Sequence, residues 1–200
     1  MRLQVCKDDH EWVDAAWTWL HSELKTGQRV FIPAGGTPTP LYRRWVKDPS
    51  VFLNSLRLIQ IDEIINGPQR GTFRHFLETE MSPFVSQMEF ITNADQNADA
   101  AILGVGVNGH VAFHEPQLPK NFNGGCVRLS CETLEYLHLD DPTWGVTYGV
   151  GSFLQCKNIL VMAKGERKQR IIKQALAKKD LPISWILEHP KVTLLTDFSL

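Results

Sequence analysis

Polar residues that could perform acid–base chemistry stand at the ends of apolar runs in this sequence. Asp62 and Glu63 follow the run RLIQI. A carboxylate whose pKa is raised by burial can remove a proton from a carbon atom next to a carbonyl group. The same pair could instead cap the segment that follows it, because carboxylates accept hydrogen bonds from the first N–H groups of helices. The sequence alone leaves both interpretations open.

A second group of candidates lies in the segment LGVGVNGHVAFHEP, residues 103–116. A histidine beside a carboxylate is typical of a proton-transfer unit, because the carboxylate orients the ring and raises its basicity. The candidates for this unit are Asn108, His110 and Glu115, with Gly109 in the turn between them. Ordinary polar loop residues would give the same pattern, so this segment does not decide between the two.

The same segment allows two further interpretations, which we consider weaker. His110 and His114 have the i, i+4 spacing of zinc ligands on a helix, but neither an HExxH motif nor an evident third ligand accompanies them. The three glycines match the dinucleotide fingerprint GxGxxG, which should open a long helix. Pro116 stops any helix within two turns, and the region around Thr133 looks like loop. From this segment we therefore expect neither a zinc ion nor a dinucleotide.

Two segments predict an anion site. Gly35, Gly36 and Thr37 lie between an apolar run and a helix-forming segment. The glycines allow close approach of the backbone, Thr37 adds a hydroxyl donor, and the next helix directs its N–H groups outward. Lys168 follows Gly165 at a similar turn, where its ammonium group can meet an anion. An ordinary turn and a solvated lysine are the alternatives, and no Gly-Lys-Ser/Thr follows to make a nucleotide-binding loop.

Apolar runs that alternate with amphipathic segments must position these residues. We expect strands at residues 2–6, 29–34, 57–62, 100–106, 158–163 and 191–197. We expect helices over the stripe Val13, Trp17, Leu20 and Leu24, and over residues 41–46, 72–84 (capped by Thr72) and 165–179. This order predicts an α/β fold with a three-layer, mostly parallel, Rossmann-like sheet that carries helices on both faces. Ligands of such sheets bind beyond the carboxyl ends of the strands, where all the candidates above fall.

The composition predicts one domain spanning residues 1–200 and disfavours several partners. With 43% hydrophobic residues and 10 Phe, 6 Trp and 3 Tyr, the chain is too apolar for disorder. A formal net charge of −1 does not attract nucleic acid or an anionic membrane. No apolar run approaches the roughly 18 residues of a membrane helix. Four dispersed cysteines and an N-terminus unlike a signal peptide predict reduced thiols in a cytoplasmic protein, whose oligomeric state stays undetermined.

Taken together, these segments resemble the glucosamine-6-phosphate deaminase/isomerase family, which shares its fold with the 6-phosphogluconolactonases. The resemblance covers most of the chain in the family's order. The matching segments are PAGGTPTPLY, IDEIIN, LGVGVNGHVAFHEP, TYGVGSFLQCKNILVMAKGERK and SWILEHPKVTLLTD. The implied activity is the conversion of an amino-sugar 6-phosphate into a ketose 6-phosphate and ammonia, which is a hydrolytic deamination coupled to isomerisation.

The resemblance also implies residue roles. Asp62 would move a proton between C2 and C1 of the opened sugar, and His110, held by Glu115, would assist ring opening. Asn108 falls where relatives carry Asp or Asn. The positions that hold the 6-phosphate in the family correspond to Gly35, Gly36, Thr37 and Lys168. Glu63 and Gly109 are expected elsewhere in the pocket, and the partner is a small sugar phosphate without any cofactor.

The chain departs from the family pattern in two places. The stretch between Asp62 and Leu103 is short for the family, and the lid region after Glu115 is compressed. The lid's phosphate-binding arginine has no convincing match, with Arg128 as the nearest candidate. A 6-phosphogluconolactonase-type lactone hydrolase and a non-catalytic sugar-phosphate-binding protein are therefore alternatives. The motif AFHEP speaks against the lactonase, and a complete proton-transfer set speaks against the binding protein.

Overall fold

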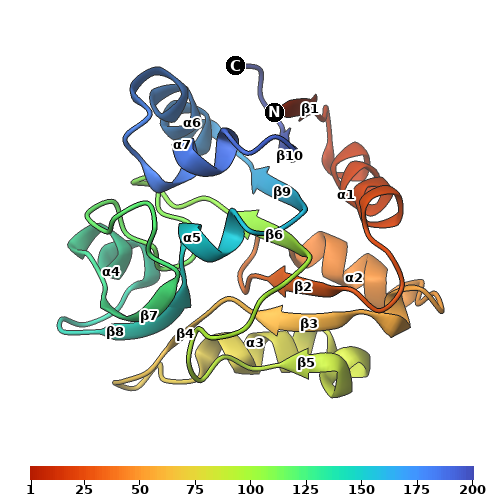
Figure 1. Ribbon diagram of the computed structural model, residues 1–200, viewed down its shortest axis with the longest axis horizontal. Helices are drawn as coiled ribbons and strands as arrows, with labels where there is room; N and C mark the ends of the chain where they lie inside the picture. The colour runs from red at the N-terminus through yellow and green to blue at the C-terminus, as the bar shows by residue number, and fades with distance from the viewer.

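A seven-stranded parallel sheet organises the chain in the computed structural model, which describes residues 1–200 (Figure 1). The strands are β1 (Arg2–Val5), β2 (Arg29–Ile32), β3 (Arg57–Gln60), β5 (Met88–Glu89), β6 (Ala100–Gly104), β9 (Asn158–Ala163) and β10 (Val192–Thr196). Their order is β1-β10-β9-β6-β2-β3-β5, and every neighbouring pair is parallel. The central strands are continuous apolar runs because both faces of the sheet are covered.

Helices cover both faces and complete the predicted three layers (Figure 1). They are α1 (Asp9–Glu23), α2 (Thr39–Lys47), α3 (Thr72–Glu80), α5 (Val150–Phe153), α6 (Glu166–Lys178) and α7 (Pro182–Leu187), with 3-10 turns at Leu53–Ser55 and Ser82–Gln87. Successive strand residues enter different cores, as when Val30 and Ile32 pack with α1 and α2 while Phe31 packs against α5. No helix combines the length and the apolar character that crossing a membrane requires.

The buried face of α1 differs from the predicted stripe. Trp12 and Trp19 are fully buried against the sheet, whereas Val13 and Trp17 are only partly buried. The two buried indoles fill the space between α1 and the sheet, and Trp17 instead lies under the guanidinium group of Arg44, 4.8 Å from its ring centroid. The prediction failed because the sequence offers three tryptophans on this helix and does not show which of them face the core.

A second, antiparallel sheet was not predicted. It contains β4 (Asp62–Ile64), β7 (Gly124–Arg128) and β8 (Trp144–Tyr148) in the order β4-β8-β7. The expected strand 57–62 bends at Ile61, whose N–H donates to Ile32 in the large sheet and whose carbonyl accepts from Tyr148 in the small one. The chain therefore changes sheets immediately before Asp62.

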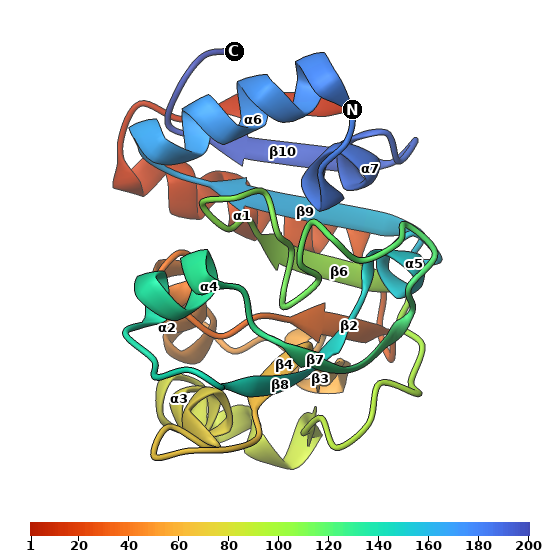
Figure 2. The same ribbon diagram turned by 90° about the vertical axis from the view of Figure 1, so that its left-hand side faces the viewer.

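A short helix, α4 (Cys131–Leu137), lies where the sequence analysis expected a loop. Ser130 caps its first turn by accepting a hydrogen bond from the N–H of Thr133. Figure 2 shows α4 beside the carboxyl ends of the parallel strands. These ends hold a topological switch point, because the chain continues from β2 to β3 on one side of the sheet and from β6 to β9 on the other. Such a point is where sheets of this kind bind ligands.

Candidate active site

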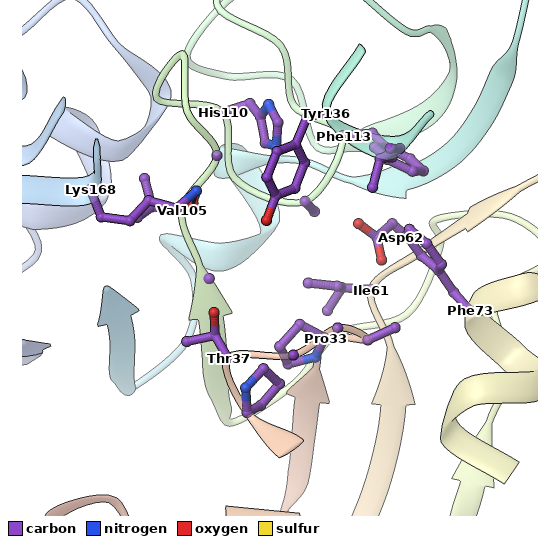
Figure 3. A pocket seen from close by; sticks show the side chains of 18 residues that line it. Pro33, Thr37, Ile61, Asp62, Phe73, Val105, His110, Phe113, Tyr136 and Lys168 are labelled. Atoms are coloured by element: carbon purple, nitrogen blue, oxygen red, sulfur yellow. Dashed lines mark hydrogen bonds between the residues drawn. The ribbon is translucent and has the colours of Figure 1, made fainter. Parts of the chain in front are cut away.

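A cavity of about 170 Å³ lies beyond the carboxyl ends of β2 and β6 (Figure 3). The predicted site residues that line it are Gly35, Gly36, Thr37, Asp62, His110 and Lys168. Asn108 and Glu115 do not line the cavity. Asn108 accepts a hydrogen bond from the backbone of His110, and the carboxylate of Glu115 lies 3.9 Å from Nδ1 of the His110 ring. Segments that are far apart in the sequence thus meet at one place, as the sequence analysis required.

Asp62 lies at the bend from β3 into β4, and its carboxylate faces the cavity (Figure 3). The residue is 6% exposed. Burial, reinforced by the neighbouring charge of Glu63, raises the pKa of Asp62 to about 8, and no hydrogen bond opposes this shift. An aspartate with this pKa is a much stronger base than an ordinary one, which suits the removal of a proton from carbon.

Glu63 does not line this cavity, contrary to the prediction, because side chains alternate across strand β4. Its carboxylate accepts hydrogen bonds from the N–H groups of Phe73 (3.1 Å) and Arg74 (2.6 Å) at the start of α3. Glu63 therefore supplies the cap that was expected from Thr72. The sequence left two interpretations of the acidic pair, a group facing the cavity and a helix cap. Asp62 has the first position and Glu63 the second.

His110 lies in the turn after β6, and the N–H of its backbone donates to Oδ1 of Asn108 (3.1 Å). Its ring nitrogen Nδ1 is 3.1 Å from Oγ1 of Thr133 and 3.9 Å from Oε2 of Glu115. Burial lowers the pKa of His110 to about 4; the charge of Lys168 acts in the same direction and that of Glu115 opposes it. The ring is therefore neutral near pH 7, and one of its two nitrogens can accept a proton.

Glu115 is fully buried and held by donors. Ser130 donates through its N–H to Oε1 (3.1 Å) and through its hydroxyl to Oε2 (2.9 Å). Asn108 donates through Nδ2 to Oε2 (3.2 Å). The structure thus assembles Asn108, His110 and Glu115, but the ring forms its hydrogen bond with Thr133, which the sequence analysis missed.

Gly106 is a second residue that the sequence analysis missed as part of the site. A Cβ atom at this position would lie 2.2 Å from Nε2 of His110, so only glycine leaves room for the ring. Gly109, expected in the pocket, does not line it; its φ of +86° instead forms the turn that leads to His110. The glycine pattern of this segment thus accommodates an imidazole. A dinucleotide site would require a helix after this turn, and turns follow instead.

The glycine loop between β2 and α2 forms the opposite end of the cavity. Gly35 has a φ of +114°, a conformation that favours glycine, and its carbonyl accepts a hydrogen bond from the hydroxyl of Thr39 (2.9 Å). No side chain caps the start of α2, and because Pro38 and Pro40 have no N–H, the backbone donors left for an anion here are those of the glycine loop and of Thr39.

Lys168, in the first turn of α6, is the only lysine or arginine that lines the cavity. Its Nζ donates to the carbonyl of Val105 and lies 5.3 Å from the centroid of the Tyr136 ring. Burial, reinforced by Arg167, lowers the pKa of Lys168 to about 8. Tyr136 on α4 also lines the cavity and was not predicted.

Arg128, the nearest candidate for a phosphate-binding arginine, is outside the site. It lies at the end of β7 with its side chain 57% exposed, and it pairs with both oxygens of Asp141 (3.0 and 2.9 Å). The sequence shows that an arginine follows the lid region, but it does not show whether the side chain points into the cavity or away from it.

His114 does not face the cavity with His110. Its ring is fully buried near Phe122 and Trp185, and its Nδ1 accepts a hydrogen bond from the N–H of Val150 (3.0 Å). The segment between the two histidines forms turns, so their i, i+4 spacing does not place them on one helix face.

Comparisons with known proteins bear on the family of the chain and on its fold. The family model described as "Glucosamine-6-phosphate isomerases/6-phosphogluconolactonase" matches residues 73–195, more than half of the chain. A glucosamine-6-phosphate deaminase of Bacillus cereus (strain B4264) is 24% identical over 230 aligned residues, which cover 98% of this chain and 87% of the relative. A deaminase of Bacillus thuringiensis (strain Al Hakam) is 25% identical with the same coverage.

Solved structures of both branches share the fold. A monomeric glucosamine-6-phosphate deaminase superposes with a TM-score of 0.81 at 22% identity and covers 98% of this chain and 97% of its own. The 6-phosphogluconolactonase of Leishmania guyanensis gives a TM-score of 0.75 at 16% identity, with 98% and 95% coverage. From the matched residues and the shared architecture, this chain belongs to the family of glucosamine-6-phosphate isomerases and 6-phosphogluconolactonases.

Proposed function

We propose that the protein is a glucosamine-6-phosphate deaminase-like enzyme, which converts an amino-sugar 6-phosphate and water into a ketose 6-phosphate and ammonia. The observation that carries this proposal is the buried carboxylate of Asp62, with a pKa of about 8, in the same cavity as the neutral ring of His110. The curated deaminases that align along 98% of the chain support it.

The glycine loop and Lys168 suit the phosphate group of the substrate. Loop N–H groups and the hydroxyl of Thr37 can donate to its oxygens, and the ammonium group of Lys168 adds a charge-assisted hydrogen bond. Because the phosphate does not react, the energy of binding it can hold the sugar in register through successive steps. The sugar then extends toward Asp62 and His110.

His110 suits the opening of the sugar ring. Neutral Nε2 accepts the proton of the hydroxyl on C1, and the imidazolium passes that proton to the ring oxygen as its bond to C1 breaks, which leaves an aldehyde at C1. The imidazolium that forms in this step lies 3.9 Å from the carboxylate of Glu115, whose charge stabilises it.

Asp62 suits the isomerisation that follows. Its carboxylate takes the proton from C2, which the neighbouring aldehyde makes acidic, and the electron pair moves toward C1 to give an enolamine. The same carboxyl returns a proton to C1, which leaves an imine at C2. Addition of water to C2 then releases ammonia and a ketose phosphate. A well-placed acid or base typically contributes about 10²–10⁴ in rate.

Two alternatives share the same cavity. Lactonases superpose on the chain over 98% of its length, and His110 could activate water against a phosphorylated sugar lactone. A protein that binds sugar phosphates without turnover would fit the short α4 and the cavity wall that lacks an arginine. Neither alternative uses a carbon base at position 62, which is why we favour the deaminase.

One assay separates the three functions. The purified protein is incubated with glucosamine 6-phosphate, galactosamine 6-phosphate and 6-phosphogluconolactone, and ammonia release, lactone hydrolysis and calorimetric binding are measured in parallel. We expect ammonia from at least one amino sugar. Hydrolysis of the lactone without ammonia release, or binding without turnover, would select one of the alternatives instead.

A further inference from the structure

The first turn of α4 contacts the proton-transfer residues directly. Oγ1 of Thr133 lies 3.1 Å from Nδ1 of His110 and 3.2 Å from Oγ of Ser130. The hydroxyl of Ser130 lies 2.9 Å from Oε2 of Glu115. A continuous chain of hydrogen bonds therefore connects the imidazole to the buried carboxylate through two hydroxyl groups, both of which come from the start of one helix.

Counting protons fixes the direction of this chain. A carboxylate only accepts hydrogen bonds, so the single proton of the Ser130 hydroxyl goes to Glu115 in a charge-assisted bond. Oγ of Ser130 then only accepts: the N–H of Thr133 (3.3 Å) takes one lone pair, and the hydroxyl of Thr133, at 3.2 Å, takes the other ahead of Nδ2 of Asn108 at 3.5 Å. With that proton used, Oγ1 of Thr133 can only accept from Nδ1 of His110.

We propose that Thr133 is a positioning residue that holds His110 as the Nδ1–H tautomer and thereby presents an unprotonated Nε2 to the cavity. The meaning of this tautomer for catalysis rests on the proposed function. The tautomer itself does not, because it follows from the order of donors and acceptors between the ring and Glu115.

The packing around the ring supports this role. A Cβ atom at Gly106 would be almost equidistant from Nε2, Cδ2 and Cε1 of His110 (2.2, 2.3 and 2.3 Å), so this glycine packs against the face of the ring and limits its movement on that side while Nε2 stays open to the cavity. Thr133 is fully buried and contacts the opposite nitrogen. Glu115 is farther away, with 3.9 Å between its Oε2 and Nδ1, so it acts on the ring through the two hydroxyls and through its charge.

Helix α4 contributes to the site in two ways. The helix that supplies Thr133 at its start also lines the cavity with Leu137 and with Tyr136, which is labelled in Figure 3. The wall of the cavity and the tautomer of its base therefore depend on one helix of seven residues.

Nuclear magnetic resonance tests the tautomer without any substrate. The protein is labelled with ¹⁵N-histidine, two-bond ¹H–¹⁵N correlations are recorded near pH 7, and the His110 signals are identified as those missing in His110→Gln. We expect wild type to show a protonated Nδ1 and an unprotonated Nε2. Thr133→Val, which keeps the side-chain shape but removes the acceptor, should gain the Nε2–H tautomer, whereas Thr133→Ser should keep the wild-type pattern.

Activity provides the second readout. Thr133→Val should lower kcat about 10- to 100-fold, a part of what an acid–base group contributes, with KM within a few-fold of wild type. Thr133→Ser should restore most of kcat. A role limited to packing would give the opposite ranking, because Val fills the buried site as Thr does and Ser leaves a gap.

An Nε2–H tautomer in wild type overturns the proposal, and that spectrum does not depend on whether Thr133→Val folds. Identical histidine spectra in wild type and folded Thr133→Val overturn it as well. If wild type shows the Nδ1–H tautomer but turns over no amino-sugar phosphate, the proposed function fails while the role of Thr133 stands.

Discussion

Replacing Gly106 with Ala should remove most of the activity while leaving the fold intact. The new Cβ atom would lie 2.2 Å from Nε2 and 2.3 Å from Cδ2 and Cε1 of His110. The backbone at Gly106 has no positive φ, so alanine is compatible with its conformation. The clash therefore concerns one side chain, which can move, and not the main chain.

The size of the effect follows from the displacement. The imidazole must shift by more than about 1 Å to take Nε2 from 2.2 Å to ordinary van der Waals contact with the new methyl group, and a misplacement of about 1 Å already costs about 10²-fold in rate. The shift also stretches the 3.1 Å contact between Nδ1 and Thr133. We expect kcat to fall at least about 100-fold, with the affinity for the phosphate end of the substrate little changed.

The assay is ammonia release from glucosamine 6-phosphate, together with thermal unfolding and calorimetric binding. Gly104→Ala is the matched control, because Gly104 also lines the cavity and a Cβ atom there meets nothing within 4 Å. We expect kcat of this control to stay within about tenfold of wild type, a small part of an acid–base contribution. Wild-type kcat in Gly106→Ala would refute the assignment of His110 to the reaction.

Three further perturbations follow from the charges of the site. Asp62 must lose its proton and Lys168 must keep its own, and both pKa values are about 8, so kcat/KM should form a bell centred near pH 8. Lys168→Arg should move the alkaline limb to higher pH; an unchanged limb would place another group on it. Lys168→Ala should weaken substrate binding by roughly 1.5–3 kcal/mol, the contribution of a charged hydrogen bond, and an unaltered Kd from calorimetry would place Lys168 outside the phosphate site. Glu63→Gln should move the acid limb to lower pH, because the charge of Glu63 raises the pKa of Asp62, and should destabilise the protein by about 1–3 kcal/mol through the weakened cap of α3 in chemical unfolding. An acid limb that does not move in this variant would mean that another group than Asp62 titrates there.

The large sheet could be predicted because its strands are continuous apolar runs. The expected strand 158–163 matches β9, and the run 29–34 contains β2. Burial on both faces makes such strands visible in sequence. The same signal located the cavity, since residues that follow strands of a parallel sheet must gather at one edge.

The small sheet and α4 could not be predicted for physical reasons. Strand β4 has only three residues, and its pairing with β8 joins segments about eighty residues apart, so no local pattern marks it. The helix α4 has one turn signal, the cap at Ser130, which also occurs in loops. The contact between Thr133 and His110 depends on this helix and was therefore hidden as well.

The sequence also could not distinguish the roles of Asp62 and Glu63. Both residues follow an apolar run, and only the alternation along β4 sends Asp62 into the cavity and Glu63 under α3. The sequence did not reveal that the strand continues past Ile61, so it could not distinguish the two roles.

The central claim is that Asp62 is the base that moves a proton between two carbon atoms. Asp62→Asn keeps the size of the side chain and removes the base, so the decisive measurement compares ammonia release and calorimetric binding of glucosamine 6-phosphate in this variant and in wild type. We expect binding within a few-fold of wild type and turnover lower by at least about 100-fold. Turnover at the wild-type rate would contradict the account.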